Sequence, residues 1–146
     1  MDELITNLIK ENKIIEAKIH AIKNLFFDKK KFYYYLGLCS IAEKDYESAI
    51  KFFNNSIKHG LKHFLLYYNL GTAYLEMNQN HRAKDCFNKS IELNNQYYNN
   101  YLNLAYIYLM ENDVKSAYRI IKTATSIFEE PKIIQIEKKI LKALNI

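Results

Sequence analysis

The side chains that most often do chemistry in proteins are sparse in this 146-residue chain, and none has the spacing of a catalytic site. His59 and His63 are four residues apart, but Gly60 lies between them and is expected to end a helix. Two imidazoles without a third ligand also fall short of a zinc site. His81 and Cys86 are five apart, so they do not share a helix face as a Cys–His nucleophile pair would.

Acid–base and phosphate-binding motifs are missing as well. Glu129 and Glu130 are adjacent, so their carboxylates point apart. With three glycines, the chain has neither a G-x-x-x-x-G-K-[ST] loop nor a G-x-G-x-x-G loop. We therefore expect a protein that is not an enzyme and that binds no metal or cofactor.

Composition indicates one ordered, helical domain. Hydrophobic residues make up 49% of the chain, which argues against disorder, and three Gly and one Pro disfavour a β-rich fold. The net charge of +5 permits acidic partners without requiring them. Cys39 and Cys86 are expected to be reduced, small core side chains. The acidic start, Met1-Asp2-Glu3, and the absence of a run of ~18 apolar residues predict a cytoplasmic protein without a membrane span.

The strongest signal in the sequence is a recurrence of residue types every 34 residues. A small residue recurs at Gly37, Gly71 and Ala105. Four further positions keep the same step: Tyr33, Tyr67 and Tyr101; Leu36, Leu70 and Leu104; Ala49, Ala83 and Ala117; Phe53, Phe87 and Ile121. Five positions in register over three copies, with no insertion, indicate a structural repeat.

This pattern resembles the tetratricopeptide repeat, a 34-residue helix–turn–helix unit. The resemblance implies an all-α fold: a right-handed α-solenoid of stacked antiparallel helix pairs with terminal capping helices. Residues 1–146 would form a single domain of this kind. We expect a degenerate repeat or N-terminal cap hairpin at residues 1–29, repeats at 30–63, 64–97 and 98–131, and a C-terminal capping helix at 132–146.

Small residues and polar caps are expected to set the geometry of each helix pair. Gly or Ala at the eighth place of the first helix would face Ala at the twentieth place, on the second helix, which allows an interaxial distance of about 8 Å. Asp45, Asn80 and Asp113 are expected to cap the second helices, because their side-chain oxygens can accept amide hydrogen bonds.

In the family that this chain resembles, the first helix of each pair lines a concave groove. The corresponding positions here are rich in tyrosine and leucine with asparagines between them, whereas the second helices are charged. An apolar surface of this kind marks an interaction site. The expected groove residues are Tyr34, Tyr35, Leu38, Ile41, Leu65, Tyr68, Asn69, Thr72, Leu75, Asn99, Leu102, Asn103, Tyr106 and Leu109.

The resemblance predicts a protein–protein interaction scaffold whose groove binds a hydrophobic peptide or an amphipathic helix. Of the asparagine and basic residues with which family members bind the C-terminal carboxylate of chaperones, only Asn69 is present, so that partner is not expected. Two alternatives stay open. One is helical-repeat RNA binding, which the placement of lysines away from the groove disfavours. The other is a homo-oligomer whose groove holds a terminal helix of another copy.

Overall fold

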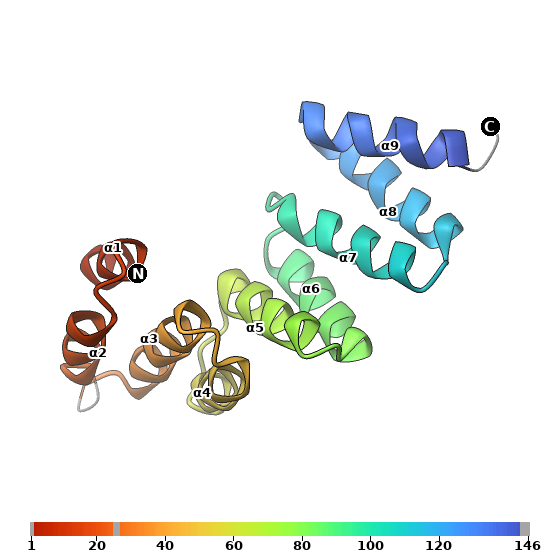
Figure 1. Cartoon of the computed structure of the whole chain (residues 1–146). Helices are drawn as coiled ribbons and strands as arrows, with labels where there is room; N and C mark the ends of the chain where they lie inside the picture. The colour runs from red at the N-terminus through yellow and green to blue at the C-terminus, as the bar shows by residue number, and fades with distance from the viewer. Residues whose placement is uncertain (1, 25–26, 144–146) are drawn as a thin grey trace.

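Nine helices in chain order build an elongated array, seen in the computed structural model, which describes residues 2–24 and 27–143 (Figure 1). The helices are α1 (Glu3–Lys10), α2 (Ile14–Ile22), α3 (Lys29–Ala42), α4 (Tyr46–Lys58), α5 (Phe64–Glu76), α6 (Asn80–Leu93), α7 (Asn99–Met110), α8 (Val114–Ile127) and α9 (Pro131–Ala143). Helices adjacent in sequence pack together, and no strand occurs in this part of the chain. The prediction of an all-α helical repeat is confirmed.

The four helix hairpins turn in the same way. Each contains one residue with a left-handed backbone: Asn12, Lys44, Asn78 and Asn112, with φ between 57° and 60°. Five residues after each of them comes a fully buried alanine: Ala17, Ala49, Ala83 and Ala117. The α1–α2 hairpin therefore has the turn geometry of the other three, although its sequence repeats only weakly.

Side-chain caps begin two of the second helices as predicted. Asp45 accepts a hydrogen bond from the Ser48 N–H at 3.1 Å, and Asp113 accepts one from the Ser116 N–H at 3.0 Å. The prediction for Asn80 is wrong, because Asn80 is the first residue of α6 and Gln79, which precedes it, makes no side-chain cap bond.

The glycines of the first helices make room for phenylalanine rings. A Cβ at Gly37 would overlap the ring of Phe53, and a Cβ at Gly71 would lie 2.8 Å from Cε1 of Phe87. This corrects the expectation that the glycine faces the alanine of the second helix, since the nearest atoms belong to the aromatic ring four residues further on. In the α7–α8 hairpin, Ala105 replaces the glycine and Ile121 replaces the phenylalanine. The larger side chain on α7 is therefore matched by a smaller one on α8.

Buried side chains form two clusters that meet at α7. The N-terminal core runs from Ile5 through Phe53 and Phe87 to Leu104 and Ile107 of α7. The C-terminal core contains Tyr101 and Ala105, also of α7, together with Ala117, Ile121, Ala124, Ile133 and Ile140. Because Ile133 and Ile140 are buried in this second cluster, α9 is packed on α8 at the C-terminal end of the described helices.

In two of the hairpins, a buried serine hydroxyl of the second helix bonds a carbonyl of the first helix. Ser56 Oγ donates to the carbonyl of Lys30 at 2.6 Å, and Ser90 Oγ donates to the carbonyl of Phe64 at 2.9 Å. Ser90 Oγ also accepts a bond of 2.9 Å from Nδ2 of the fully buried Asn100. The equivalent position in α8 is Ala124, which has no hydroxyl.

Candidate peptide-binding groove

The N-terminal end of the expected groove is closed. Tyr34 is 2% exposed and Tyr35 is 0% exposed, so the structure corrects their placement on an open surface. The Tyr35 hydroxyl accepts a hydrogen bond from the Asp2 N–H, and the Tyr34 ring packs 6.0 Å from that of Phe53. Burial raises the pKa of both phenols, Tyr34 most strongly. Both tyrosines belong to the core, because Tyr34 packs against Phe53 of α4 and Asn69 of α5, while α1 and α2 pack on α3 and Asp2 reaches Tyr35.

Leu38 and Ile41 of α3 lie next to α1 and are partly accessible to solvent. Both are half-buried, and they line a shallow hollow of about 370 Å³. The hollow also contains Thr6, Ile9, Lys10 and Ala42. The inner side of α3 is therefore shared with the N-terminal hairpin.

The centre of the expected groove is a polar and aromatic network. Tyr68 is half-buried, with its ring 4.9 Å from that of Tyr97 in an edge-to-face arrangement. Burial raises the pKa of Tyr68, and the side chain of Asn103 opposes that effect. Asn69 Nδ2 donates to the Tyr34 hydroxyl at 3.4 Å. Tyr68 and Asn69 are therefore already in contact with other side chains of the protein.

The remaining central positions are also half-buried. Thr72 Oγ1 donates to the Tyr68 carbonyl at 3.1 Å, so its hydroxyl is occupied within α5. Leu65, Leu75 and Asn99 are intermediate in exposure. This section offers less apolar surface than the sequence led us to expect.

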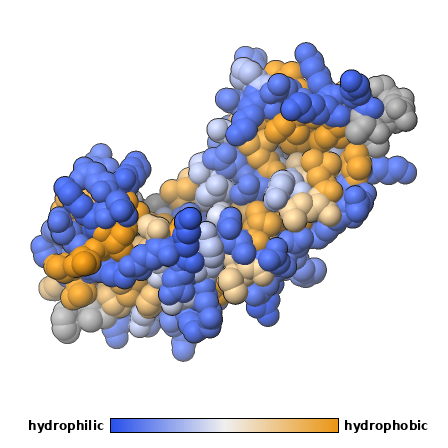
Figure 2. Space-filling view, in the orientation of Figure 1, coloured by the Kyte–Doolittle hydropathy of each residue, from blue (hydrophilic) through white to orange (hydrophobic). Residues whose placement is uncertain are grey.

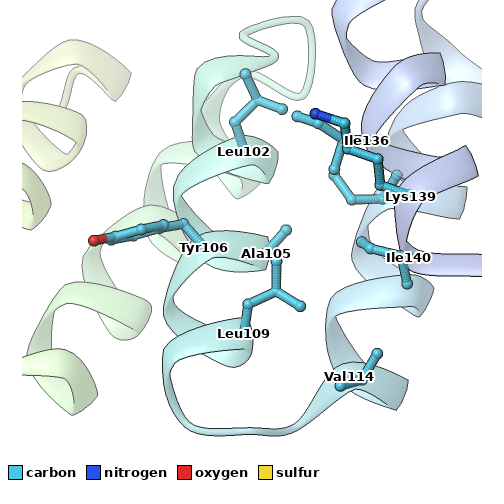
Figure 3. A pocket seen from close by; sticks show the side chains of 9 residues that line it. Leu102, Ala105, Tyr106, Leu109, Val114, Ile136, Lys139 and Ile140 are labelled. Carbon is cyan, nitrogen blue, oxygen red and sulfur yellow. The ribbon is translucent and has the colours of Figure 1, made fainter. Parts of the chain in front are cut away.

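The C-terminal end holds an open apolar hollow of about 340 Å³ between α7, α8 and α9. Tyr106 is 53% exposed and Leu109 is 39% exposed at its edge. Lys139 is the one charged residue among those that line it: Leu102, Ala105, Tyr106, Leu109, Val114, Ile121, Ile136, Lys139 and Ile140. In Figure 3, Leu102, Ala105 and Leu109 point from α7 toward Ile136 and Ile140 of α9. Three of the expected groove residues, Leu102, Tyr106 and Leu109, therefore line one hollow.

A second, smaller hollow lies on the other side of α7. The hydroxyl end of Tyr106 points away from α9 (Figure 3). With Leu75, Glu76, Asn78 and Met110, Tyr106 lines a space of about 200 Å³ between α5 and α7. We call the two hollows together the C-terminal groove, with Leu75, Leu102, Tyr106, Leu109, Met110, Ile136 and Ile140 as its apolar residues.

The sequence analysis missed the contribution of α9. It treated residues 132–146 only as a cap, whereas Ile136, Lys139 and Ile140 line the groove. A usable signal was present, because the 34-residue step carries Leu102 onto Ile136 and Tyr106 onto Ile140. Residues 144–146, the end of the expected helix, lie outside the described residues.

The two cysteines are buried or half-buried, and His59 and His63 make contacts that stabilise the fold. Burial raises the pKa of Cys39 to about 11 and that of Cys86 to about 12, so both thiols are protonated and unreactive at neutral pH. His59 stacks on Tyr33 with centroids 5.3 Å apart, and His63 caps α5 by accepting from the Leu65 N–H at 3.2 Å. Over residues 2–24 and 27–143, no three His, Cys, Asp or Glu side chains cluster closely enough to bind a metal ion.

The length and composition of the helices bear on whether the chain could span a membrane. Within the described ranges, none of them combines the length and the apolar content needed to cross a bilayer.

Comparison with known proteins finds a repeat family that matches the centre of the chain. Residues 31–58 and 65–97 match the tetratricopeptide repeat. No curated protein sequence matches the chain. Solved structures that resemble it share its fold at low sequence identity.

Three of these structures illustrate the similarity. The Pseudomonas aeruginosa pilF structure has a TM-score of 0.84 at 13% identity and covers 98% of this chain and 67% of its own. YrrB, described as a TPR protein with an unusual peptide-binding site, has a TM-score of 0.77 at 18% identity and covers 97% and 74%. The first TPR of Spaghetti (RPAP3), bound to the HSP90 peptide SRMEEVD, has a TM-score of 0.68 at 17% identity and covers 81% and 97%.

The fold supports a role as a protein–protein interaction scaffold. The 34-residue register, the helix hairpins that share one turn and the match over two repeats agree with one another. The matched residues of this chain resemble tetratricopeptide repeats, and the chain shares the fold of solved TPR proteins.

Proposed function

We propose that the protein is a non-catalytic scaffold whose C-terminal groove binds an apolar segment of another protein. The observation that carries this proposal is the hollow of about 340 Å³ between α7, α8 and α9, with Tyr106 and Leu109 exposed at its edge. Its volume falls in the range of pockets that enclose a ligand. YrrB and the first TPR of Spaghetti, both described with a peptide or a peptide-binding site, support the class of partner.

The lining favours an amphipathic helix over an extended polar peptide. Apolar side chains form the walls on α7 and α9, and the two hollows flank Tyr106 on either side. A helix presents apolar residues at positions i, i+3, i+4 and i+7, which would fill both hollows together. Lys139 at the edge favours a partner with an acidic residue beside its apolar anchors.

The other ligand classes find less support. Asn69, the residue shared with the chaperone-binding clamp, is hydrogen-bonded to Tyr34. For RNA, the groove offers only Lys139, while Lys84 and Lys89 pair with Glu111 and Glu92. Nucleic-acid binding requires clustered cations that reach phosphates.

Selection of random peptides on the immobilised full chain tests the proposal. We expect enriched peptides with apolar residues at i and i+4 and a nearby Asp or Glu. Their affinity, measured by fluorescence anisotropy, should fall at least tenfold for Leu109→Glu, because a carboxylate would be placed in an apolar hollow. The matched control is Leu93→Glu, which changes an exposed leucine at the end of α6.

Two results would contradict the proposal. One is a set of selected peptides that bind the Leu109→Glu variant and the unchanged chain equally well. The other is tighter binding of a mixed-sequence RNA than of any peptide, with a steep loss of RNA affinity as salt rises. Circular dichroism of both variants shows whether the helices remain.

A further inference from the structure

A second apolar surface lies at the other end of the molecule, on the outer side of α2. Ile15 is 77% exposed, Ile19 is 55% exposed and Ile22 is 50% exposed. Their spacing of four and three residues puts them in one stripe along the helix. Figure 2 shows hydrophobic colour gathered over the region of α2, separate from the colour around α7 to α9. We call these three residues the α2 stripe.

The other hairpins show that this stripe is specific to α2. The second helix of each hairpin has one fully buried alanine five residues after the turn, so positions in these helices can be compared by their distance from it. Counted from Ala17, the stripe residues lie two positions before, two positions after and five positions after it. The nine residues at the same places in α4, α6 and α8 are all exposed and all polar or charged: Glu47, Lys51, Asn54, His81, Asp85, Asn88, Lys115, Arg119 and Lys122. Only α2 has isoleucine where its counterparts have solvated side chains, which marks an interaction surface.

Charged residues beside the stripe indicate what covers it. Glu16 and Lys23 are seven residues apart, so at about 100° per residue they lie on the same flank of the stripe. Among the described residues, neither takes part in an ion pair. On the opposite flank, Lys18 is already held by Glu43 at 2.8 Å.

This arrangement is complementary to itself. The midpoint between Glu16 and Lys23 falls beside Ile19, near the centre of the stripe. If a second α2 packed antiparallel about a twofold axis at that point, Glu16 of each copy would lie beside Lys23 of the other. An isologous contact requires this match of a surface with itself.

We propose that the α2 stripe is a self-association surface that pairs antiparallel with α2 of a second copy of this chain. Ile19 packs against Ile19 at the axis, Ile15 packs against Ile22 on each side, and two Glu16–Lys23 ion pairs flank them. The nine-residue α2 is about 13 Å long, so the contact is small and the dimer is weak. The C-terminal groove stays open, and the dimer therefore presents two grooves, which raises avidity for a repeated partner. This inference does not depend on what the groove binds.

Sedimentation velocity of the full chain tests the surface. The mass should rise with concentration from 17.4 kDa toward twice that value. Ile19→Lys, which installs the residue type found at Lys51, should weaken association roughly tenfold or more. Leu93→Lys, an equal change at an exposed leucine of α6, should leave association unchanged. A chain that stays monomeric at millimolar concentration, or an Ile19→Lys variant that still associates, would overturn the proposal.

Charge exchange tests the antiparallel arrangement. Glu16→Lys alone and Lys23→Glu alone should each weaken self-association, because like charges then face each other. An equimolar mixture of these two variants should associate more tightly than either variant by itself, since both contacts in the mixed dimer join opposite charges. A mixture that associates no better than its components, or assemblies larger than a dimer, would overturn this arrangement.

Discussion

The α3–α4 and α7–α8 hairpins occupy equivalent places in the repeat but are packed by different means. In the first, Gly37 lies under the ring of Phe53, and Ser56 bonds the carbonyl of Lys30. In the second, Ala105 and Ile121 take the places of the glycine and the phenylalanine, and Ala124 takes the place of the serine. Ala105 and Ile121 also line the apolar hollow beside α9. The repeat therefore conserves the path of the backbone, while the hairpin with less aromatic filling is the one that leaves space for a ligand.

The largest expected effect comes from breaking the match between glycine and phenylalanine. Gly37→Ala should lower the free energy of unfolding by about 3 kcal/mol, because overlap with the buried Phe53 ring outweighs the gain in helix propensity. Adding Phe53→Ile, the pairing used by α7 and α8, should recover part of that loss. Urea denaturation of the two single variants and the double variant measures the coupling. Strictly additive effects would show that the two positions do not compensate each other.

The buried hydroxyls should give a smaller, graded effect. Ser90→Ala should cost about 2 kcal/mol, because it removes the bond to the Phe64 carbonyl and leaves Nδ2 of buried Asn100 without its acceptor. Ser56→Ala removes one bond and should cost about 1 kcal/mol. Thermal unfolding followed by circular dichroism gives both values, with Asn54→Ala at an exposed position of α4 as the control. Equal losses at Ser56 and Ser90 would contradict the role assigned to Asn100.

The smallest effect concerns pH and the start of α5. His63 accepts a hydrogen bond from the Leu65 N–H only while its Nδ1 is unprotonated, and burial lowers its pKa below the usual 6.5. The unfolded chain therefore binds the proton more readily, and the stabilisation is present above about pH 6.5 and is lost as the pH falls below it. His63→Asn keeps a capping residue that does not titrate. Between pH 5 and pH 8, its stability should vary less than that of the unchanged chain, and an identical pH profile would contradict this role.

Local features of the fold could be predicted from the sequence because they depend on neighbouring residues. The 34-residue step, the caps at Asp45 and Asp113 and the end of α4 at Gly60 all follow from nearby residue types. The cap expected at Asn80 failed by one residue, which is a common error at helix ends.

The candidate site was harder to predict because it depends on contacts between units. Tyr35 has the pattern of a surface tyrosine, but the weakly repeated N-terminal hairpin packs on α3, and Asp2 donates a hydrogen bond to the Tyr35 hydroxyl. Ile136 and Ile140 have the pattern of a cap, yet they form one wall of the hollow. In both cases, the missing information was how the terminal helices pack on the repeats.

The division of the buried side chains at α7 has a dynamic consequence. Leu104 and Ile107 belong to one cluster, while Tyr101 and Ala105 on the same helix belong to the other. In an array where each unit is stabilised mainly by its neighbours, the last two helices can open and close without melting the first six. Amide hydrogen exchange would then be faster in α8 and α9 than in α4, and a ligand that bridges α7 and α9 would slow it. The C-terminal end, which has space for a ligand, is therefore also the end whose local opening a bound ligand would suppress.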